Sequence, residues 1–150
     1  MANKLKEDIA HLESCFVYSN LSHAQRLKVG ELLVIPHGVS VIGVNGTAPK
    51  TSNQCEYTDP ETGQLVTFPH VICGAANAIY KAAKQGVMID GSTLYSTDSP
   101  CQKCTHALIS VGVKRIVYVR KYRLTDHLQL LTDAGISVEQ IQIQYEHLIK

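Results

Sequence analysis

Apolar residues recur at helical spacing near the start of the chain and gather in strand-like runs after it. An amphipathic helix is predicted over residues 4–19, where one face carries Leu5, Ile9, Leu12 and Phe16. Two runs rich in valine, leucine and isoleucine follow, over residues 28–35 and 39–44, and the turn-forming Pro36-His37-Gly38 separates them. This pattern predicts an antiparallel hairpin after the first helix.

A long polar segment, residues 45–69, separates this hairpin from a second half in which strand and helix patterns alternate. We expect the segment to be a functional or partly disordered loop. Helices are predicted over residues 75–85, 101–111 and 125–134, and strands over residues 92–97, 115–119 and 138–143. Strands joined through helices pair in parallel with right-handed crossovers. The predicted fold class is therefore α/β, a five-stranded mixed sheet with helices on both faces.

The composition fits one domain over residues 1–150. It weighs against an extended basic surface that would bind nucleic acid or an anionic membrane. The chain is 18% charged with a formal net charge of +1. We therefore expect no nucleic-acid and no membrane partner, while a small anionic ligand stays open. The charged N-terminus lacks an apolar signal core, and no run approaches the roughly 20 apolar residues of a membrane span. A cytoplasmic location is expected.

Three of the five cysteines stand at the spacing of a metal site. Cys73 lies at the start of one predicted helix, while Cys101 and Cys104 lie one turn apart at the start of the next, in a Pro-Cys-x-x-Cys unit. A helix N-terminus favours the thiolate that a metal needs. Three protein ligands leave the fourth position of zinc open for water, which indicates a catalytic site. The alternative is three buried thiols in a packed core.

The same residues carry a resemblance to a known family. The segments Cys73-Gly74-Ala75-Ala76-Asn77-Ala78 and Ser99-Pro100-Cys101-Gln102-Lys103-Cys104 resemble the zinc-dependent cytidine deaminase superfamily. Similarity to its deoxycytidylate (dCMP) deaminases, including those of bacteriophages, extends over residues 26–30, 43–47, 53–56, 90–95 and 112–118. The resemblance implies a cytidine deaminase-like three-layer α/β/α fold with zinc as cofactor. It also implies hydrolytic deamination of dCMP, or of a 5-substituted dCMP, to the uracil nucleotide and ammonia.

Two positions depart from the family pattern. Cys73 stands where dCMP deaminases usually have histidine, and a third thiolate makes zinc a weaker acidifier of its water. A compensating donor is therefore expected, with His70 the nearest candidate in sequence. Ala75 stands where the motif has the glutamate that carries protons, so we expect zinc and substrate binding with little or no turnover. A natural non-catalytic homologue and an engineered glutamate-to-alanine change are both open, and the intact surroundings favour the second.

The resemblance also implies a substrate site. The backbone of Gly74 and Ser99 would lie near the base, Asn45 would hydrogen-bond the sugar, and Tyr122 would pack on the sugar and meet the phosphate. Cationic candidates for the phosphate are Arg26, Lys28, Lys121 and Arg123. The last two follow a predicted strand, where α/β sheets place ligand crevices. For Asn45 the alternative is an ordinary turn residue before Gly46. For the lysines and arginines the alternative is a basic surface that only meets solvent.

The family resemblance further implies a homo-oligomer, commonly a hexamer, controlled by dCTP and dTTP, in the host cytoplasm if the chain is phage-encoded. Cys55 resembles a position that binds a second, structural zinc in some relatives, but a loop thiol is favoured, so one zinc is expected. Cys73 keeps open a deaminase of free cytidine or deoxycytidine. A non-catalytic, zinc-stabilised nucleotide-binding module is the alternative outside enzymes.

Overall fold

A five-stranded sheet in the order β2-β1-β5-β6-β7 forms the centre of the protein. The computed structural model describes residues 2–36, 38–123 and 125–150. β1 (Gly30–Val34) pairs antiparallel with β2 (Ser40–Val44) and with β5 (Thr93–Asp98). β6 (Arg115–Arg120) and β7 (Ser137–Gln140) extend the sheet in parallel with β5. The predicted hairpin, the parallel pairing and the five-stranded mixed sheet are confirmed.

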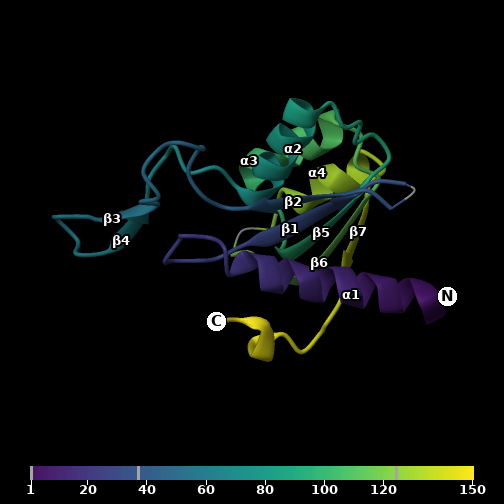
Figure 1. The fold of residues 1–150 in the computed structure, drawn as a ribbon, viewed down its shortest axis with the longest axis horizontal. Coiled ribbons are helices and arrows are strands. Elements are labelled where there is room, and N and C mark those ends of the chain that lie inside the picture. The colour runs from purple at the N-terminus through teal and green to yellow at the C-terminus, as the bar shows by residue number, and fades with distance from the viewer. Residues whose placement is uncertain (1, 37, 124) are drawn as a thin grey trace.

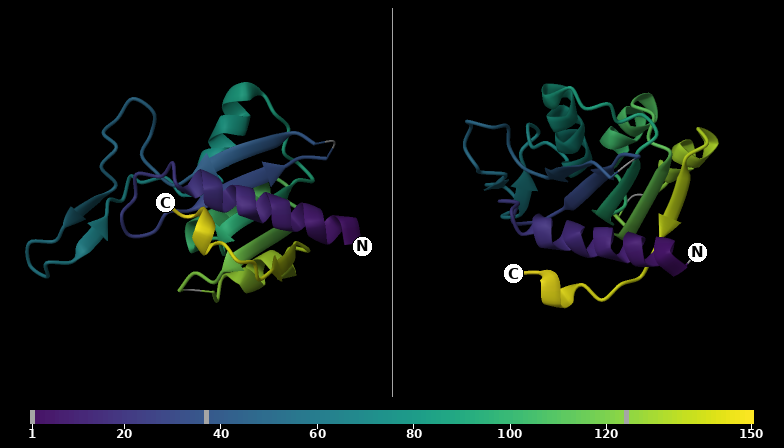
Figure 2. Two further views of the ribbon diagram at one scale, coloured as in Figure 1. Left: turned by 60° about the horizontal axis from the view of Figure 1, so that its bottom comes forward. Right: turned by 45° about the vertical axis from the view of Figure 1, so that its right-hand side comes forward.

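Helices cover both faces of this sheet. α1 (Ala2–Ser19) lies on one face, and α2 (Gly74–Gln85), α3 (Gln102–Ser110) and α4 (Leu128–Asp133) lie on the other, as Figure 1 and Figure 2 show. The short 3-10 helix η1 (Glu146–Leu148) lies on the α1 side. The three-layer α/β/α arrangement is thus confirmed. In the described part of the chain, no helix combines the length and the apolar composition that crossing a membrane requires.

Each helical layer buries its own apolar cluster against the sheet. The cluster under α1 contains Leu12, Cys15, Phe16, Leu32, Tyr95, Val117 and Val119. The cluster on the opposite face includes Leu33, Ala75, Ala78, Leu94, Cys104, Leu108, Ile116 and Leu131. Phe16 also stacks on Tyr145, with ring centroids 4.1 Å apart, and this contact holds the C-terminal segment against α1.

Residues 45–69 contain a hairpin that the sequence pattern did not predict. β3 (Glu56–Thr58) and β4 (Leu65–Thr67) form a separate two-stranded antiparallel sheet, which projects from the main sheet in Figure 1. Gly63, with a φ of 69°, closes its turn, and the Gly63 N–H donates to the Asp59 carbonyl at 2.8 Å. The expectation of an irregular loop was wrong here, because strands of three residues are too short to show an alternating pattern.

Two elements near the C-terminus are shorter than predicted. α4 begins at Leu128, because residues 126 and 127 form a turn in which the Leu128 N–H donates to the Thr125 carbonyl at 3.0 Å. β7 ends at Gln140: the Ile141 N–H still donates to the Tyr118 carbonyl at 2.9 Å, but Ile141 and Ile143 pack against the cluster under α1. Both predictions followed apolar spacing beyond the point where the backbone changes direction.

The turn predicted at Pro36-His37-Gly38 joins β1 to β2. His37 lies outside the described residues. Next to it, Gly38 has a φ of 91°, and the Ile35 N–H donates to the Val39 carbonyl at 2.8 Å. A positive φ of this size favours glycine, so Gly38 suits this connection.

An ion-pair network ties α1 to the sheet. Arg115 on β6 donates from Nη1 to Asp8 Oδ1 and from Nη2 to Asp8 Oδ2, both at 2.8 Å, and it also pairs with Glu139. Tyr95 Oη donates to Asp8 Oδ1 at 2.7 Å. Hydrogen bonds from Arg115 hold the pKa of Asp8 and the pKa of Glu139 below their usual values. Charge therefore fixes α1 in addition to apolar packing.

Replacing Asp8 with asparagine is expected to lower the free energy of unfolding at neutral pH by about 2 kcal/mol, the scale of hydrogen bonds to charged groups. Because the folded-state pKa of Asp8 is lowered, its contribution is complete above the unfolded-state value of about 3.9 and disappears as pH falls through the folded-state value. Denaturant unfolding of the parent and Asp8→Asn proteins should therefore show a stability difference that shrinks below about pH 4. A difference that stays constant into acid would contradict this assignment.

Candidate functional site

Three cysteine thiols lie together at the starts of two helices. Cys73 is the N-cap residue of α2 and Cys101 the N-cap residue of α3, both with extended backbone, and Cys104 lies in the first turn of α3. The Sγ atoms of Cys73 and Cys101 are 3.2 Å apart, and all three Sγ atoms lie within 4.8 Å of one another. These three thiols form the thiol cluster. In the described ranges no other group of three or more His, Cys, Asp or Glu side chains is placed to hold a metal ion.

The thiol cluster has the chemistry and the spacing of a zinc site. Zinc–sulfur bonds of about 2.3 Å in a tetrahedral arrangement place sulfur atoms roughly 3.8 Å apart, which the cluster can provide with small shifts. The Cys73 side chain does not cap its own helix, so its sulfur is available to a metal. Cys101 was predicted inside a helix and instead precedes it, which turns its sulfur toward that of Cys73.

Hydrogen bonds within the thiol cluster concentrate negative charge on Cys101. Hydrogen bonds from Cys104 and Cys73 lower the pKa of Cys101, and the backbone N–H groups of Cys104 and Lys103 add to this effect. The pKa of Cys73 and the pKa of Cys104 are raised, first by their hydrogen bond to Cys101. The cluster therefore favours one thiolate before a metal binds, and a bound metal would deprotonate the other thiols.

The thiol cluster lines a cavity of about 810 Å³, a volume typical of small-molecule sites. The starts of α2 and α3, the ends of β5 and β6, and the segment that enters β1 contribute to its wall. The predicted site residues on this wall are Arg26, Asn45, Cys73, Gly74, Ala75, Ser99, Cys101, Cys104, Lys121, Tyr122 and Arg123. Of the described residues predicted to belong to the site, Lys28 and His70 do not line the cavity.

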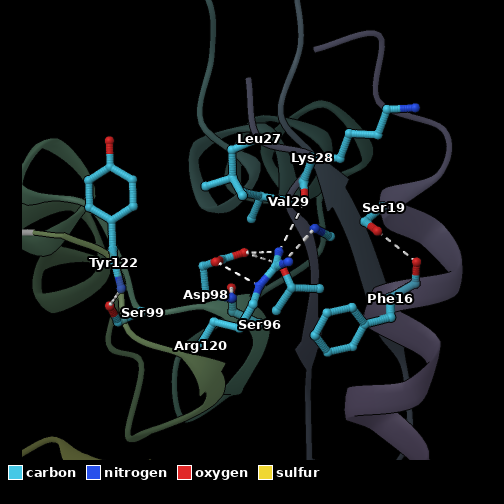
Figure 3. Close-up of polar contacts among 12 residues, drawn as sticks. Phe16, Ser19, Leu27, Lys28, Val29, Ser96, Asp98, Ser99, Arg120 and Tyr122 are labelled. Atoms are coloured by element: carbon cyan, nitrogen blue, oxygen red, sulfur yellow. Dashed lines mark hydrogen bonds and ion pairs between the residues drawn. The ribbon is translucent and has the colours of Figure 1, made fainter. Parts of the chain in front are cut away.

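Ser99 and Tyr122 meet where β5 and β6 end. The Ser99 N–H donates to the Arg120 carbonyl at 2.8 Å, and the Tyr122 N–H donates to Ser99 Oγ at 2.7 Å. In Figure 3 the Tyr122 ring points away from this backbone contact. The guanidinium of Arg123 lies 5.6 Å from the centre of that ring. These side chains thus stand at the carboxyl ends of two parallel strands, the position where ligand crevices of α/β sheets occur.

Hydrogen bonds inside the protein hold the Asn45 side chain. Its Oδ1 accepts from the Val29 N–H at 2.9 Å and from Ser22 Oγ at 2.8 Å. Its Nδ2 donates to the Leu27 carbonyl at 2.8 Å. Asn45 therefore fixes the segment that enters β1, and only its second Nδ2 proton is available for a ligand.

His70 lies on the surface, where its ring stacks on Phe68 with centroids 5.1 Å apart. A different histidine, which the sequence analysis did not single out, lies beside the thiol cluster. His127 is buried, and its Nε2 is 2.6 Å from the carbonyl oxygen of Pro100, directly before Cys101. His127 precedes α4, and nothing in its local sequence indicates that α4 packs against this turn.

An ion pair that the sequence analysis missed lies beside Ser99 in the cavity wall. Arg120 donates from Nε and Nη2 to the two carboxylate oxygens of Asp98, at 3.0 and 2.8 Å, as Figure 3 shows. Nη2 also donates to the Lys28 carbonyl at 3.4 Å, and Thr97 Oγ1 donates to Asp98 Oδ2 at 2.6 Å. Asp98 and Arg120 end two neighbouring parallel strands, and opposite charges at that position were the available signal.

Glu31 is a further residue of the cavity wall that the sequence analysis missed. It stands in β1 within the apolar run Val29-Gly30-Glu31-Leu32-Leu33-Val34, and only 4% of it is exposed. Its Oε1 accepts a hydrogen bond from Ser96 Oγ at 3.0 Å, and its Oε2 is buried with no partner among the described residues. Burial raises the pKa of Glu31 to about 8, with the charges of Cys101 and Asp98 adding and the Ser96 hydrogen bond opposing. A charged residue inside an apolar strand was the available signal.

Comparison with known proteins identifies the family. The family model of the cytidine and deoxycytidylate deaminase zinc-binding region matches residues 5–120, a range that includes the whole thiol cluster. The chain belongs to this deaminase family. The family resemblance inferred from the cysteine motifs and its zinc-binding character are thereby confirmed.

Individual relatives of this deaminase chain point the same way. One solved structure is that of dCMP deaminase from the cyanophage S-TIM5 in complex with dCMP and dUMP, whose sequence is 35% identical to this chain. The match covers 94% of this chain and 99% of the S-TIM5 chain, with a TM-score of 0.81. The deoxycytidylate deaminase of Enterobacteria phage T2 is 36% identical over 75 residues, 48% of this chain and 40% of its own length. That of Schizosaccharomyces pombe is 26% identical over 140 residues, 89% of this chain and 43% of its own. The chain thus spans less than half the length of these two curated relatives.

Proposed function

We propose that this chain is a zinc-dependent deaminase that converts dCMP to dUMP and ammonia. The position of the thiol cluster on the wall of the cavity carries the proposal, because metal ligands and room for a nucleotide occur in one place. Zinc held by the three sulfurs would polarise and acidify a water molecule at its open position. The S-TIM5 relative, solved with dCMP and dUMP, supports this substrate class.

The cavity wall gives the pyrimidine ring its proposed place. Gly74 and Ala75 carry no polar side chain, and the ring is proposed to lie beside them with its C4 amine toward the thiol cluster. The backbone of Ser99 is proposed to meet the edge of the base. Asn45 is proposed to offer its remaining Nδ2 proton to the sugar.

The phosphate is proposed to lie against basic side chains of the wall. Arg26, Lys121 and Arg123 are exposed and line the cavity, and they take no part in the ion pairs found among the described residues. Arg120, in contrast, is neutralised by Asp98. Three uncompensated cations at the cavity favour a monophosphate over a free nucleoside.

The substrate assignment is tested by ammonia release from dCMP, CMP, deoxycytidine, cytidine and 5-hydroxymethyl-dCMP, using the zinc-loaded chain and an Ala75→Glu variant. We expect kcat/KM for dCMP to exceed that for deoxycytidine by about 100-fold, because two hydrogen bonds to a charged phosphate contribute about 1.5 kcal/mol each. Replacing Lys121 and Arg123 together with glutamine should remove most of this preference and leave the zinc content unchanged.

Two results would count against this function in different ways. Equal rates with and without phosphate would remove the phosphate assignment and favour a nucleoside deaminase. No ammonia from any substrate, although both proteins bind zinc and dCMP, would favour the non-catalytic nucleotide-binding module.

Several expectations stay predictions. They are a homo-oligomer such as a hexamer, its control by dCTP and dTTP, a single domain over residues 1–150, and a cytoplasmic location. Light scattering coupled to size-exclusion chromatography, with and without dCTP, tests the first two.

A further inference from the structure

The proposed deamination needs a group that moves protons, and position 75 does not supply one. The group must take a proton from water and deliver protons to the ring and to the leaving amine. Ala75 is buried and has only a methyl group. Among the described residues that line the cavity, three carry carboxyl groups: Glu31, Glu56 and Asp98.

Asp98 and Glu56 are committed to other contacts. Both oxygens of Asp98 accept from Arg120, and Oδ2 also accepts from Thr97. Glu56 Oε1 accepts from the N–H groups of Gln25 and Arg26, at 3.0 and 3.2 Å, and so holds the segment before β1. Glu56 Oε2 has no partner among the described residues, but these contacts hold it at residues 25–26, not at the start of α2.

Glu31 lies directly against Gly74, between Cys73 and Ala75 in the sequence. A Cβ atom built on Gly74 would be 3.2 Å from Cδ of Glu31 and 3.3 Å from its Oε2, tighter than an ordinary contact. The carboxyl group of Glu31 therefore occupies the space beside α2 that a side chain at position 74 would need. Two small residues, Gly74 and Ala75, leave this space open to a side chain that comes from β1.

The two oxygens of Glu31 have different surroundings. Ser96 Oγ holds Oε1 at 3.0 Å, which fixes the orientation of the carboxyl group. Oε2 is buried and has no partner among the described residues. Glu31 lines the same cavity as the thiol cluster. A buried acceptor without a partner costs free energy, so its presence here calls for a donor that comes with a ligand.

We propose that Glu31 is the catalytic proton carrier of this deaminase, taking from β1 the role that the family motif gives to position 75. The inference rests on the proposed function and deepens it. Water oxygen bonds to C4 of the ring while one water proton passes through Glu31 Oε2 to N3. The second proton passes by the same oxygen to the amine nitrogen. The C4–N bond then breaks, ammonia leaves with that electron pair, C4 keeps a carbonyl oxygen, and Glu31 is again a carboxylate.

This proposal replaces the expectation of an inactive chain with a measurable activity. The zinc-loaded parent protein should release ammonia from dCMP. Glu31→Gln keeps the shape of the side chain and the hydrogen bond from Ser96 but cannot carry the proton, so the rate should fall by about 100- to 10,000-fold. Zinc content and the Kd for dCMP should stay within about threefold, since a general acid–base residue acts mainly in the transition state. Adding Ala75→Glu to Glu31→Gln should recover activity.

A second readout does not depend on turnover. The 5′-monophosphate of pyrimidin-2-one deoxyribonucleoside has no amine at C4, so a deaminase can hydrate its ring and then go no further. We expect the parent protein to bleach the long-wavelength absorbance of this ring, and Glu31→Gln to bind the analogue about 100-fold more weakly or worse. Glu139→Gln removes a carboxyl group from β7, outside the cavity wall, and should behave as the parent protein in both assays.

The outcomes separate this inference from the proposed function. A parent protein and a Glu31→Gln variant of equal activity would overturn the role of Glu31, as would a loss in Glu56→Gln alone. An inactive parent with an active Ala75→Glu variant would also overturn it while the deaminase function stands. No ammonia and no hydration in any variant that binds zinc and dCMP would overturn the proposed function itself. If Glu31→Gln does not fold, Glu31→Asp, which withdraws the carboxyl group from Gly74, must lose activity or the role is refuted.

Discussion

Serine in place of Cys101 is expected to remove zinc binding and deamination together. Cys101 is the N-cap residue of α3, and its Sγ lies 3.2 Å from that of Cys73, so its sulfur joins the two helix starts at the metal position. A serine hydroxyl at the same N-cap position is not deprotonated by zinc at neutral pH in the way that a thiol is. Structural zinc sites contribute about 10–16 kcal/mol over four ligands, so losing one should cost about 2.5–4 kcal/mol, a fall in affinity of roughly 70- to 900-fold.

Competition with a chromophoric zinc chelator measures this loss, and metal analysis gives the zinc content. Zinc binds the folded state, so adding a chelator to the parent protein should lower its Tm, whereas Cys101→Ser should already melt at that lower value. Cys55→Ser is the matched control. Cys55 is buried and lies outside the thiol cluster, and its Sγ donates to the Asn53 carbonyl at 3.6 Å.

The control also tests the expectation of a single zinc. The parent and Cys55→Ser proteins should each hold one zinc ion per chain. Two ions in the parent and one in Cys55→Ser would show that the second, structural site exists. Full zinc content in Cys101→Ser would contradict the assignment of the thiol cluster as the metal site.

The sequence predicts the fold of this protein well wherever apolar spacing is long and regular. The first helix and the paired runs over residues 28–35 and 39–44 are examples, because periodicity in them reflects one buried face. The hairpin of β3 and β4 escaped prediction, since Glu56–Thr58 and Leu65–Thr67 are only three residues each. A strand this short forms because it pairs with another strand, and the residues of the strand itself do not indicate which segment that is.

The same distinction applies to the site. Cys73, Cys101 and Cys104 were predictable because ligand spacing in a motif is local and specific. The role of Glu31 was not predictable, because its carboxyl group fits beside α2 only where Gly74 has no side chain. Glu31 and Gly74 belong to different elements. His70 illustrates the opposite error, because closeness to Cys73 in sequence does not place its ring near the sulfur. Roles that arise from packing between elements therefore need the structure.

Gly43 is the residue on which the distance between the sheet and the thiol cluster depends. It lies in β2 opposite Glu31, and a Cβ atom built on it would be 2.1 Å from the Gly74 carbonyl oxygen and 2.8 Å from the Ala78 backbone nitrogen. Neither contact is with a flexible side chain. A methyl group at position 43 can be accommodated only if the first turn of α2 moves away from the sheet.

Gly43→Ala is therefore expected to reduce stability and zinc affinity at once. Overpacking against backbone should cost about 3 kcal/mol, which corresponds to a fall in Tm of roughly 10 °C for a chain of this size. Cys73 precedes α2, so moving that helix start should also separate its sulfur from Cys101 and weaken zinc binding by about tenfold or more. Thermal unfolding and chelator competition measure the two effects.

Gly46→Ala is the matched control, because a Cβ built there meets nothing within 4 Å, and its Tm should stay close to that of the parent. If Gly43→Ala kept both the parent Tm and the parent zinc affinity, the close approach of α2 to β2 would not be what positions Cys73.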